Sequence, residues 1–305
     1  MKIPDVSEKY LGKIGETDLG NGYIAGGADG MPFLSFENTS KRRVMIAGEV
    51  VDDLSDHPEL AANMFDNRQN DPVEWARMWK ELGMDMICLR LKGTDPSIGK
   101  RSPREAAELV DKIVKETQLP VIVCGCGIPE TDKDVMRAVS ESVKDTKLIL
   151  SKADEEDHKT ISSAAMAGNH AIVAFSNLDV NLAKQMNIML TDFGIEGRNI
   201  LMDPLMAPLG MGLDYSYSVN ERIRLAALGG DTMLQIPMIC DATGAWNVGD
   251  AVSDDDDLGD TISRATWWEA MTALAAMVSG ADIIIMRGPA AADMIKGYAE
   301  ELRGD

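Results

Sequence analysis

The thiol and imidazole groups of this chain are few, and their spacing fits no standard metal or nucleophile motif. Cys124 and Cys126 form a C-x-C pair. No second pair lies at a spacing that would complete four thiolate ligands, so we expect no iron–sulfur cluster held by this chain alone. The histidines are His57, His158 and His170, and none belongs to an HExxH zinc pattern. We therefore predict no metal ligands in this chain.

An acid and a lysine are the remaining candidates for direct chemistry. Asp203 ends an apolar run just before a Gly-rich turn. It could act as a general base, or it could accept hydrogen bonds from backbone amides, which is the favoured role. A Schiff-base lysine should lie inside a buried strand, but the predicted strands contain none and Lys92 only follows one. With no P-loop, GxGxxG or GxSxG motif either, we predict no complete active site in this chain alone.

The charge balance narrows the class of partner. Fifty acidic and thirty basic side chains give 305 residues a formal charge of −20. This balance disfavours nucleic acid and anionic membranes, and it fits a basic protein surface or a high-salt cytoplasm. The N-terminus MKIPDVSEKY lacks the apolar core of a signal peptide, and no apolar run reaches the roughly eighteen residues of a membrane span. We expect a soluble, cytoplasmic protein.

Eight short apolar runs are predicted to be strands. The runs are continuous rather than alternating, as is typical of parallel strands buried on both faces. They are residues 44–50, 85–91, 121–124, 148–151, 171–175, 200–203, 235–240 and 282–287.

A predicted helix follows each strand. Asp71-Pro72 opens the first helix with an N-cap residue and a proline, and Ser102 opens the second with the spacing of a capping box to Glu105. Eight such units over about 245 residues match a (β/α)₈ TIM barrel, whereas a six-stranded doubly wound sheet would leave two strands unexplained. We therefore predict an α/β fold with a TIM-barrel domain over 44–305 and an N-terminal extension over 1–43.

Two segments are irregular. We expect residues 23–36 to form either a short hairpin that closes the barrel floor or a loosely packed arm. Residues 241–260, after the seventh strand, contain four consecutive aspartates at 254–257. Such a run is usually a solvated loop, but at the mouth of a barrel it could also be a lid or a docking surface.

The loops after the carboxyl ends of the strands should form the functional mouth. Polar groups in these loops include Glu49, Asp52, Arg90 and Arg287. His57 is the one histidine predicted near the mouth, and we interpret it as a loop residue rather than a base. Arg287, which closes the last strand, could meet a phosphate or a partner carboxylate, or form an ion pair within the barrel.

Several long stretches resemble one protein family. They include NDPVEWA (70–76), VIVCGCG (121–127), KQMNIML (184–190), the block from 203 to 240 that begins DPLMAPLGMGLDYSYS, and WWEAMTALAAMVSGADIIIMRGP (267–289). Together with GGADGMPFLSFE (26–37), they resemble the small, or delta, subunit of the corrinoid iron–sulfur protein of the carbon monoxide dehydrogenase/acetyl-CoA synthase system. The resemblance covers residues 23 to 300.

The resemblance implies a (β/α)₈ subunit that pairs with a larger (gamma) subunit carrying a corrinoid and an iron–sulfur cluster. The pair would receive a methyl group from a methyltetrahydropterin, with the help of a pterin methyltransferase, and pass it to acetyl-CoA synthase. The corrinoid (cobalamin) would lie between the partner and the mouth of this barrel. The self-sufficient cobalamin signature Asp-x-His-x-x-Gly is missing, so we expect no axial cobalt ligand from this chain.

The resemblance also indicates which residues of the mouth should contact the cofactor. They are Gly125, Cys126, Gly127, Ser151, Asp203, Gly210, Gly212, Thr243 and Trp246. An alternative is an autonomous pterin-dependent methyltransferase of the same fold, which would bind the pterin in its own barrel.

Overall fold

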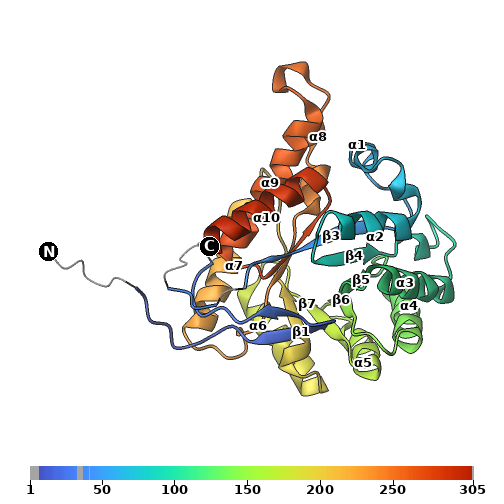
Figure 1. The fold of residues 1–305 in the computed structure, drawn as a ribbon. Coiled ribbons are helices and arrows are strands. Elements are labelled where there is room, and N and C mark those ends of the chain that lie inside the picture. The colour runs from blue at the N-terminus through green and yellow to red at the C-terminus, as the bar shows by residue number, and fades with distance from the viewer. Residues whose placement is uncertain (1–6, 33–36, 41, 304–305) are drawn as a thin grey trace.

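The fold is a ring of eight parallel strands surrounded by helices (Figure 1). The computed structural model describes residues 7–32, 37–40 and 42–303. The strand order is β8-β7-β6-β5-β4-β3-β10-β9, and a bridge between Met202 and Met238 joins the two end strands. The predicted TIM barrel is confirmed. The strands are β3 (Met45–Val51), β4 (Met86–Arg90), β5 (Val121–Cys124), β6 (Ile149–Ala153), β7 (Ala171–Phe175), β8 (Ile200–Asp203), β9 (Ile239–Asp241) and β10 (Ile283–Met286).

One predicted strand is wrong at its start. The sequence predicts a strand over 235–240, but β9 begins only at Ile239. Pro237 has no N–H to donate to a neighbouring strand, and Met238 contributes only the single bridge to β8. The closing seam of the barrel is therefore short.

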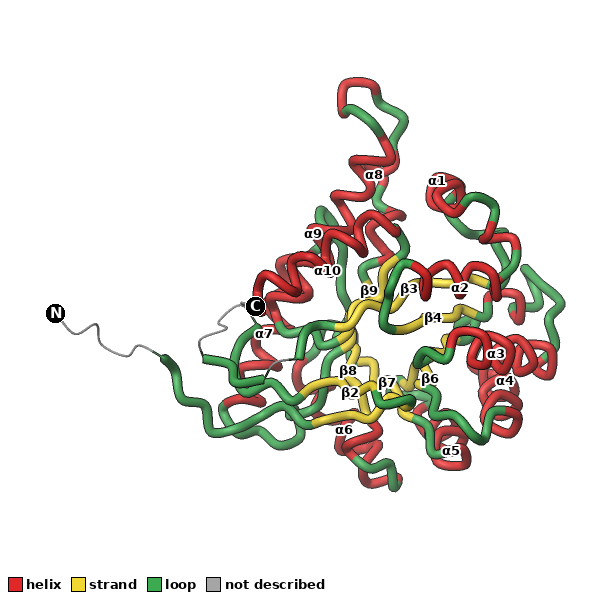
Figure 2. The backbone as a smooth tube through the Cα atoms, viewed as in Figure 1, coloured by secondary structure: helices red, strands yellow, loops and turns green. Residues whose placement is uncertain are grey.

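The helices lie outside the strand ring (Figure 2). The Asp71 side chain accepts a hydrogen bond from the Val73 N–H, and Ser102 and Glu105 form the predicted capping box. The α-helices are α1 (Glu59–Ala62), α2 (Pro72–Glu81), α3 (Pro103–Thr117), α4 (Pro129–Ser142), α5 (His158–Gly168), α6 (Val180–Phe193), α7 (Leu213–Leu228), α8 (Gly249–Val252), α9 (Thr261–Ser279) and α10 (Pro289–Arg303).

Two apolar layers explain why the strand sequences are apolar throughout. One layer fills the barrel and includes Met86, Cys88, Ile122 and Ile283. The other lies between the strands and the helices. Both faces of each strand are thus removed from water, which favours continuous rather than alternating apolar residues.

A hairpin precedes the barrel. β1 (Glu16–Gly20) pairs antiparallel with β2 (Tyr23–Gly26). Leu19 and Ala25 belong to the apolar cluster that fills the barrel, and the Thr17 hydroxyl donates to the Ile200 carbonyl at the start of β8. Of the segment predicted as a hairpin (23–36), only Tyr23–Gly26 is a strand, and 33–36 lies outside the described residues.

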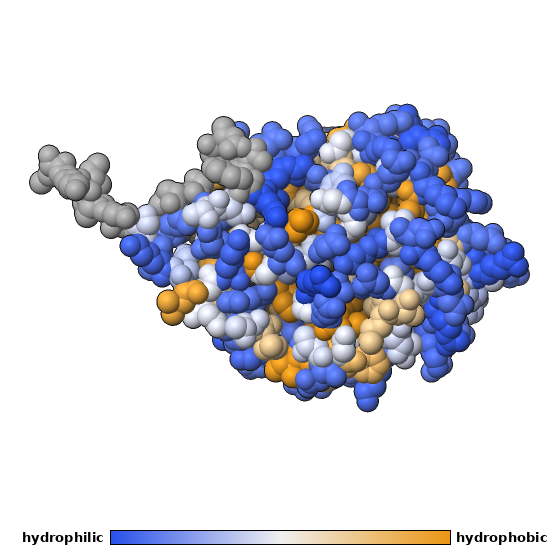
Figure 3. Space-filling view, turned by 60° about the horizontal axis from the view of Figure 1, so that its bottom comes forward, coloured by the Kyte–Doolittle hydropathy of each residue, from blue (hydrophilic) through white to orange (hydrophobic). Residues whose placement is uncertain are grey.

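The surface of the molecule is largely hydrophilic. Hydrophilic residues cover most of the face in Figure 3, with apolar residues in small groups between them. No described helix is both long and apolar enough to cross a membrane. The most prominent feature is the segment that contains α8 and the start of α9, which projects beyond the barrel at the top of Figure 1.

Candidate functional site

A cavity of about 260 Å³ opens at the carboxyl ends of the strands. Of the nine predicted contacts, Gly125, Cys126, Gly127, Ser151 and Asp203 line this cavity. The loops after β4, β5, β6 and β8 and the carboxyl end of β7 therefore meet there, as the barrel rule predicts. The other lining groups include Arg90, Lys92, Lys152, Phe175 and Asp241.

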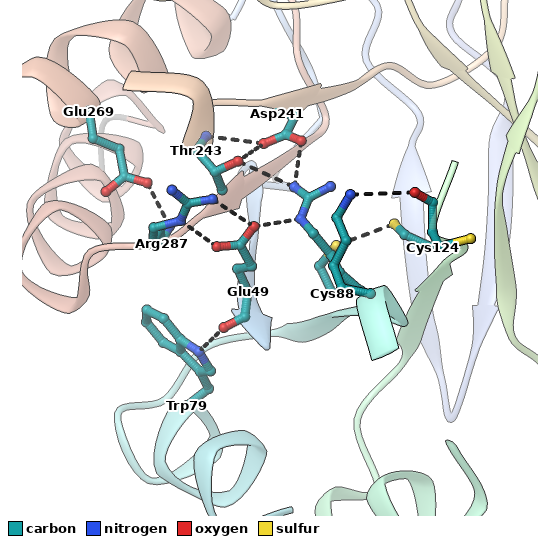
Figure 4. Close-up of polar contacts among 11 residues, drawn as sticks. Glu49, Trp79, Cys88, Cys124, Asp241, Thr243, Glu269 and Arg287 are labelled. Carbon is teal, nitrogen blue, oxygen red and sulfur yellow. Dashed lines mark hydrogen bonds and ion pairs between the residues drawn. The ribbon is translucent and has the colours of Figure 1, made fainter. Parts of the chain in front are cut away.

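Beside this cavity, a buried carboxylate joins two arginines (Figure 4). Glu49 is fully buried on β3, within the strand rather than after it. Its carboxylate accepts hydrogen bonds from Arg90 Nε at 2.5 Å and from Arg287 Nε at 2.5 Å. Burial opposes ionisation, but the guanidinium groups of Arg287 and Arg90 hold the pKa of Glu49 well below its usual range. Arg287 thus forms an ion pair within the barrel.

Arg90 extends this network to the cavity wall. Its Nη2 donates to Asp241 Oδ2 at 2.6 Å and to Thr243 Oγ1 at 3.2 Å. The Thr243 hydroxyl in turn donates to Asp241 Oδ1 at 2.6 Å. Thr243, a predicted cofactor contact, is only 4% exposed. Its hydroxyl fixes Arg90 and Asp241 instead of facing the cavity.

Trp246, also a predicted cofactor contact, belongs to the core. It is 1% exposed, and its indole N–H donates to Glu269 Oε2 at 2.8 Å. Glu269 on α9 also accepts from the Arg287 and Gly288 backbone N–H groups, just before α10 begins. Burial raises the pKa of Glu269 to about 7, although these N–H donors lower it. Trp246 does not line the central cavity, because its indole turns inward to Glu269 rather than toward the mouth.

The loop of residues 125–127 is fixed by a carboxylate of α4. Asp132 accepts hydrogen bonds from the Cys126 N–H at 2.8 Å and the Gly127 N–H at 2.9 Å. A Cβ atom on Gly125 would lie 2.2 Å from Asp132 Cγ, so no larger residue fits there without movement. Asp132 therefore uses the amide groups that were expected to meet a cofactor. The loop forms a rigid wall of the cavity.

Asp203 has features of both roles that the sequence left open, an acceptor for backbone amides and a general base. Its Oδ1 accepts the Leu205 N–H at 2.9 Å, as expected for a backbone acceptor. Burial raises its pKa to about 6, and nearby Asp241 adds to this while Lys152 and Arg90 oppose it. A carboxyl with this pKa, on the wall of an open cavity, can also exchange a proton near neutral pH.

A lysine does occur in a strand, contrary to the prediction. β6 extends two residues beyond the predicted end and includes Lys152. Its side chain is exposed, and its ammonium lies 3.3 Å from the ring centroid of Phe175. It therefore lacks the burial that a Schiff-base lysine needs.

Gly210 and Gly212 lie elsewhere on the rim. They line a separate groove between the β8–α7 loop and the start of α7, and neither lines the central cavity. Trp268 and Thr272 of α9 hold this loop by hydrogen bonds to the Leu209 carbonyl and N–H groups. The Gly-rich turn is drawn outward onto α9, so the two predicted contacts are not at the cavity.

His57 is half-buried in the loop between β3 and α1. Its ring meets Trp75 edge-on at 5.6 Å, and burial together with the nearby Arg287 lowers its pKa to about 4. It does not line the central cavity. Among the residues that the structure describes, no group of three or more His, Cys, Asp or Glu could hold a metal ion.

The protein's relatives identify its family. Residues 14–296 match the family model described as CO dehydrogenase/acetyl-CoA synthase delta subunit. The chain belongs to this family. It is 32% identical over 299 residues to the acetyl-CoA decarbonylase/synthase complex subunit delta of Methanothermobacter thermautotrophicus, covering 95% of this chain and 76% of the relative. The subunit of the same name from Methanocaldococcus jannaschii is 30% identical over 305 residues, covering 97% of this chain and 75% of the relative.

Solved structures support the fold of this delta-family chain. Dihydropteroate synthase from Stenotrophomonas maltophilia superposes with a TM-score of 0.59 at 15% identity, covering 89% of this chain and 98% of that one. The Yersinia pestis enzyme with a pterine-sulfa conjugate gives 0.59 at 14% identity, covering 95% and 100%. At these identities the likeness concerns the barrel alone.

Two central residues of this delta-family site, Glu49 and Glu269, have only weak signals in the sequence. Glu49 is the one charged residue in the run MIAGEVV, and Glu269 is the one acid in WWEAMTALAAM. A lone carboxylate in an apolar element must be paired when it is buried. That rule predicts that both carboxylates are buried and paired. It does not predict that Glu49 pairs with two arginines or that Glu269 accepts backbone N–H groups.

Proposed function

We propose that this chain is the small subunit of a two-subunit methyl carrier. A larger subunit would hold a corrinoid and an iron–sulfur cluster, and the mouth of this barrel would cover the corrinoid. The pair would take a methyl group from a methyltetrahydropterin and deliver it to acetyl-CoA synthase. The observation that carries this proposal is the match to the delta-subunit family over residues 14–296.

The size of the mouth cavity supports a covering role. At about 260 Å³ it is smaller than the roughly 300–1,000 Å³ of pockets that enclose drug-sized ligands, and a corrinoid is larger than such ligands. The mouth therefore fits one face of the cofactor and does not enclose it. When bound, the corrinoid supplies a cobalt nucleophile for methyl transfer.

The residues of the mouth suit orientation rather than bond-making. The 125–127 loop is held by Asp132, and Arg90 is held by Glu49, Asp241 and Thr243. Such fixed groups would present a stable polar surface to the amide side chains of the corrinoid. Ser151 and Lys152 on the neighbouring β6, and Asp203 at the end of β8, would supply further hydrogen bonds.

The test is reconstitution with the corrinoid-binding subunit of the same complex. We expect the isolated chain to be colourless and free of cobalt and iron. Mixed with the large subunit, it should form a one-to-one complex and change the visible spectrum of the corrinoid. Stoichiometric cobalt in the isolated chain, or no complex with the large subunit, would contradict the proposal.

A second candidate is a methyltransferase that binds the pterin in its own mouth cavity. The observation that favours it is the combination of Phe175, Asp203 and Asp241 around one cavity. An aromatic face and two carboxylates suit a flat heterocycle that carries N–H donors on its edge. Titration of the isolated chain with a methyltetrahydropterin separates the two candidates. Tight binding without the partner, lost in Asp203→Asn, would favour the enzyme.

A further inference from the structure

An apolar groove lies on the rim of the mouth, separate from the central cavity. It has a volume of about 560 Å³. It is open and lined mainly by apolar surface, from Leu209, Gly210, Gly212, Leu213, Asp214 and Tyr217. Asp214 is the one charged residue among these. The groove shares no lining residue with the central cavity.

The groove is formed before any partner arrives. Trp268 Nε1 donates to the Leu209 carbonyl at 2.7 Å, and the Leu209 N–H donates to Thr272 Oγ1 at 3.1 Å. On the other side, the Ala207 N–H donates to Ser216 Oγ of α7 at 2.8 Å. A partner that binds here does not have to order the loop first, which favours affinity.

Large apolar side chains stay exposed around this groove. Met211 is 65% exposed and Tyr215 is 69% exposed, both at the junction of the groove loop with α7. Trp267, next to the Trp268 that holds the loop, is 50% exposed. Tyrosine, tryptophan and methionine are enriched in protein–protein interfaces, and tryptophan and tyrosine are also enriched among the residues that contribute most to binding.

The stretch of sequence that carries the groove is strongly acidic. Residues 200–280 contain twelve Asp or Glu and only three Arg, with no Lys or His. Of these arginines, Arg224 is buried against Asp282 and the Gly280 carbonyl, and Arg264 binds carbonyl oxygens of its own segment. Only Arg222 is exposed without a described partner. Cations outside this range pair with Asp231 (Lys184) and Asp241 (Arg90), and the remaining carboxylates still outnumber the arginines of the region.

Many of these carboxylates lie on the projecting segment, residues 249–263, which we call the acidic arm (Figure 1). Asp250, Asp254, Asp255 and Asp257 are exposed on it. Arg264 fixes the arm, because its guanidinium donates to the carbonyls of Asp250, Ser253, Leu258 and Gly259. The arm leads into α9, the helix that holds the groove loop. The acidic arm and the groove thus share one scaffold.

We propose that the groove and the acidic arm bind a lysine- or arginine-rich amphipathic helix of a protein partner. Its apolar face would occupy the groove beside Met211 and Tyr215, and its cations would face the arm. A second copy of this chain is a poor occupant, because the same surfaces would bring carboxylates against carboxylates. Nucleic acid is disfavoured for the same electrostatic reason.

The test rests on the proposed function, because its probe is the purified corrinoid-binding subunit. Binding is measured by biolayer interferometry at about 50 mM and about 300 mM salt. One variant, M211K/Y215K, places cations at the groove. A second, D250N/D254N/D257N, neutralises exposed carboxylates of the arm without touching its caps. The matched control E141Q/D145N/D192N removes three exposed carboxylates elsewhere, on α4, the loop after it and α6.

We expect M211K/Y215K to weaken binding by at least about tenfold, because it combines like-charge repulsion with loss of apolar contact. The arm variant should weaken binding by roughly tenfold at low salt and flatten the salt dependence. The control should change it less than about twofold. Circular dichroism and melting temperature confirm that all variants are folded.

The outcomes separate the two proposals. If the wild-type chain does not bind the large subunit, the proposed function fails and this inference fails with it. If the wild-type chain binds and both variants bind equally well, the groove and arm are not the docking surface, while the proposed function stands. If light scattering detects a dimer of the isolated chain that M211K/Y215K abolishes, the occupant is a second copy and this inference is overturned.

Discussion

Glu49 on β3 and Arg287 at the end of β10 form a buried ion pair between adjacent strands, with Glu49 Oε2 and Arg287 Nε 2.5 Å apart. The pair joins the first and the last strands of the barrel in chain order. Arg90 from β4 contacts the same carboxylate. One buried charge therefore ties three neighbouring strands together directly beneath the mouth.

Glu49→Gln should destabilise the protein by about 3–5 kcal/mol, because it keeps the shape but leaves two guanidinium groups without their shared counter-charge. Urea unfolding measures this change in the free energy of unfolding. Glu74→Gln is the control, since Glu74 forms an exposed ion pair with Arg77 and should cost less than about 1 kcal/mol. A loss below about 1 kcal/mol for Glu49→Gln would mean that the pair contributes little to stability.

The sequence was sufficient for the architecture because each apolar run has the length and continuity of a strand buried on both faces. The rule that loops after the strands form the mouth also placed Gly125, Ser151 and Asp203 on one cavity. Both predictions succeeded because they depend only on where a residue lies along its strand, which the local pattern of apolar residues determines.

The predicted contacts that do not line the central cavity are residues whose direction is set by distant partners. Trp246 turns inward because its indole N–H donates to Glu269, which is 23 positions away in the sequence but close in space. Gly210 and Gly212 leave the cavity because the loop between them and β8 is bonded to Trp268. No local pattern specifies such contacts, so the loops after β8 and β9 could not be placed from sequence alone.

Glu269 should make stability depend on pH. Its pKa in the folded state is about 7, above the ordinary 4.5, so the folded protein holds a proton that the unfolded chain releases. The stability from this proton is complete below about pH 4.5 and is lost as the pH rises toward 7. The full effect is about 3 kcal/mol.

This dependence is measured by chemical unfolding of wild type and Glu269→Gln at a series of pH values. As the pH rises from about 4.5 to about 7, the free energy of unfolding of the wild type should fall relative to that of the variant. Glu141→Gln, at an exposed site on α4, is the control and should follow the wild type. A difference that stays constant with pH would contradict a raised pKa for Glu269.

Gly125→Ala should disturb the mouth loop, because the new Cβ would lie within 2.3 Å of three Asp132 side-chain atoms. We expect a loss of about 1–3 kcal/mol from overpacking. Gly249→Ala, where a Cβ meets nothing within 4 Å, is the control. In a double-mutant cycle with Asp132→Ala the two effects should not be additive, because removing the carboxylate also removes the clash. Strict additivity would contradict the contact.

Arg264→Ala should loosen the acidic arm and leave the barrel intact. The guanidinium donates to four carbonyl groups of the arm, and each such bond contributes roughly 1 kcal/mol. Limited proteolysis should therefore cleave within 249–263 at least about tenfold faster, since the rate follows the population of the opened segment. Arg222→Ala, at an exposed arginine of α7, should leave the rate unchanged. If cleavage instead begins in the barrel, or the melting temperature of the whole protein falls sharply, Arg264 stabilises more than the arm.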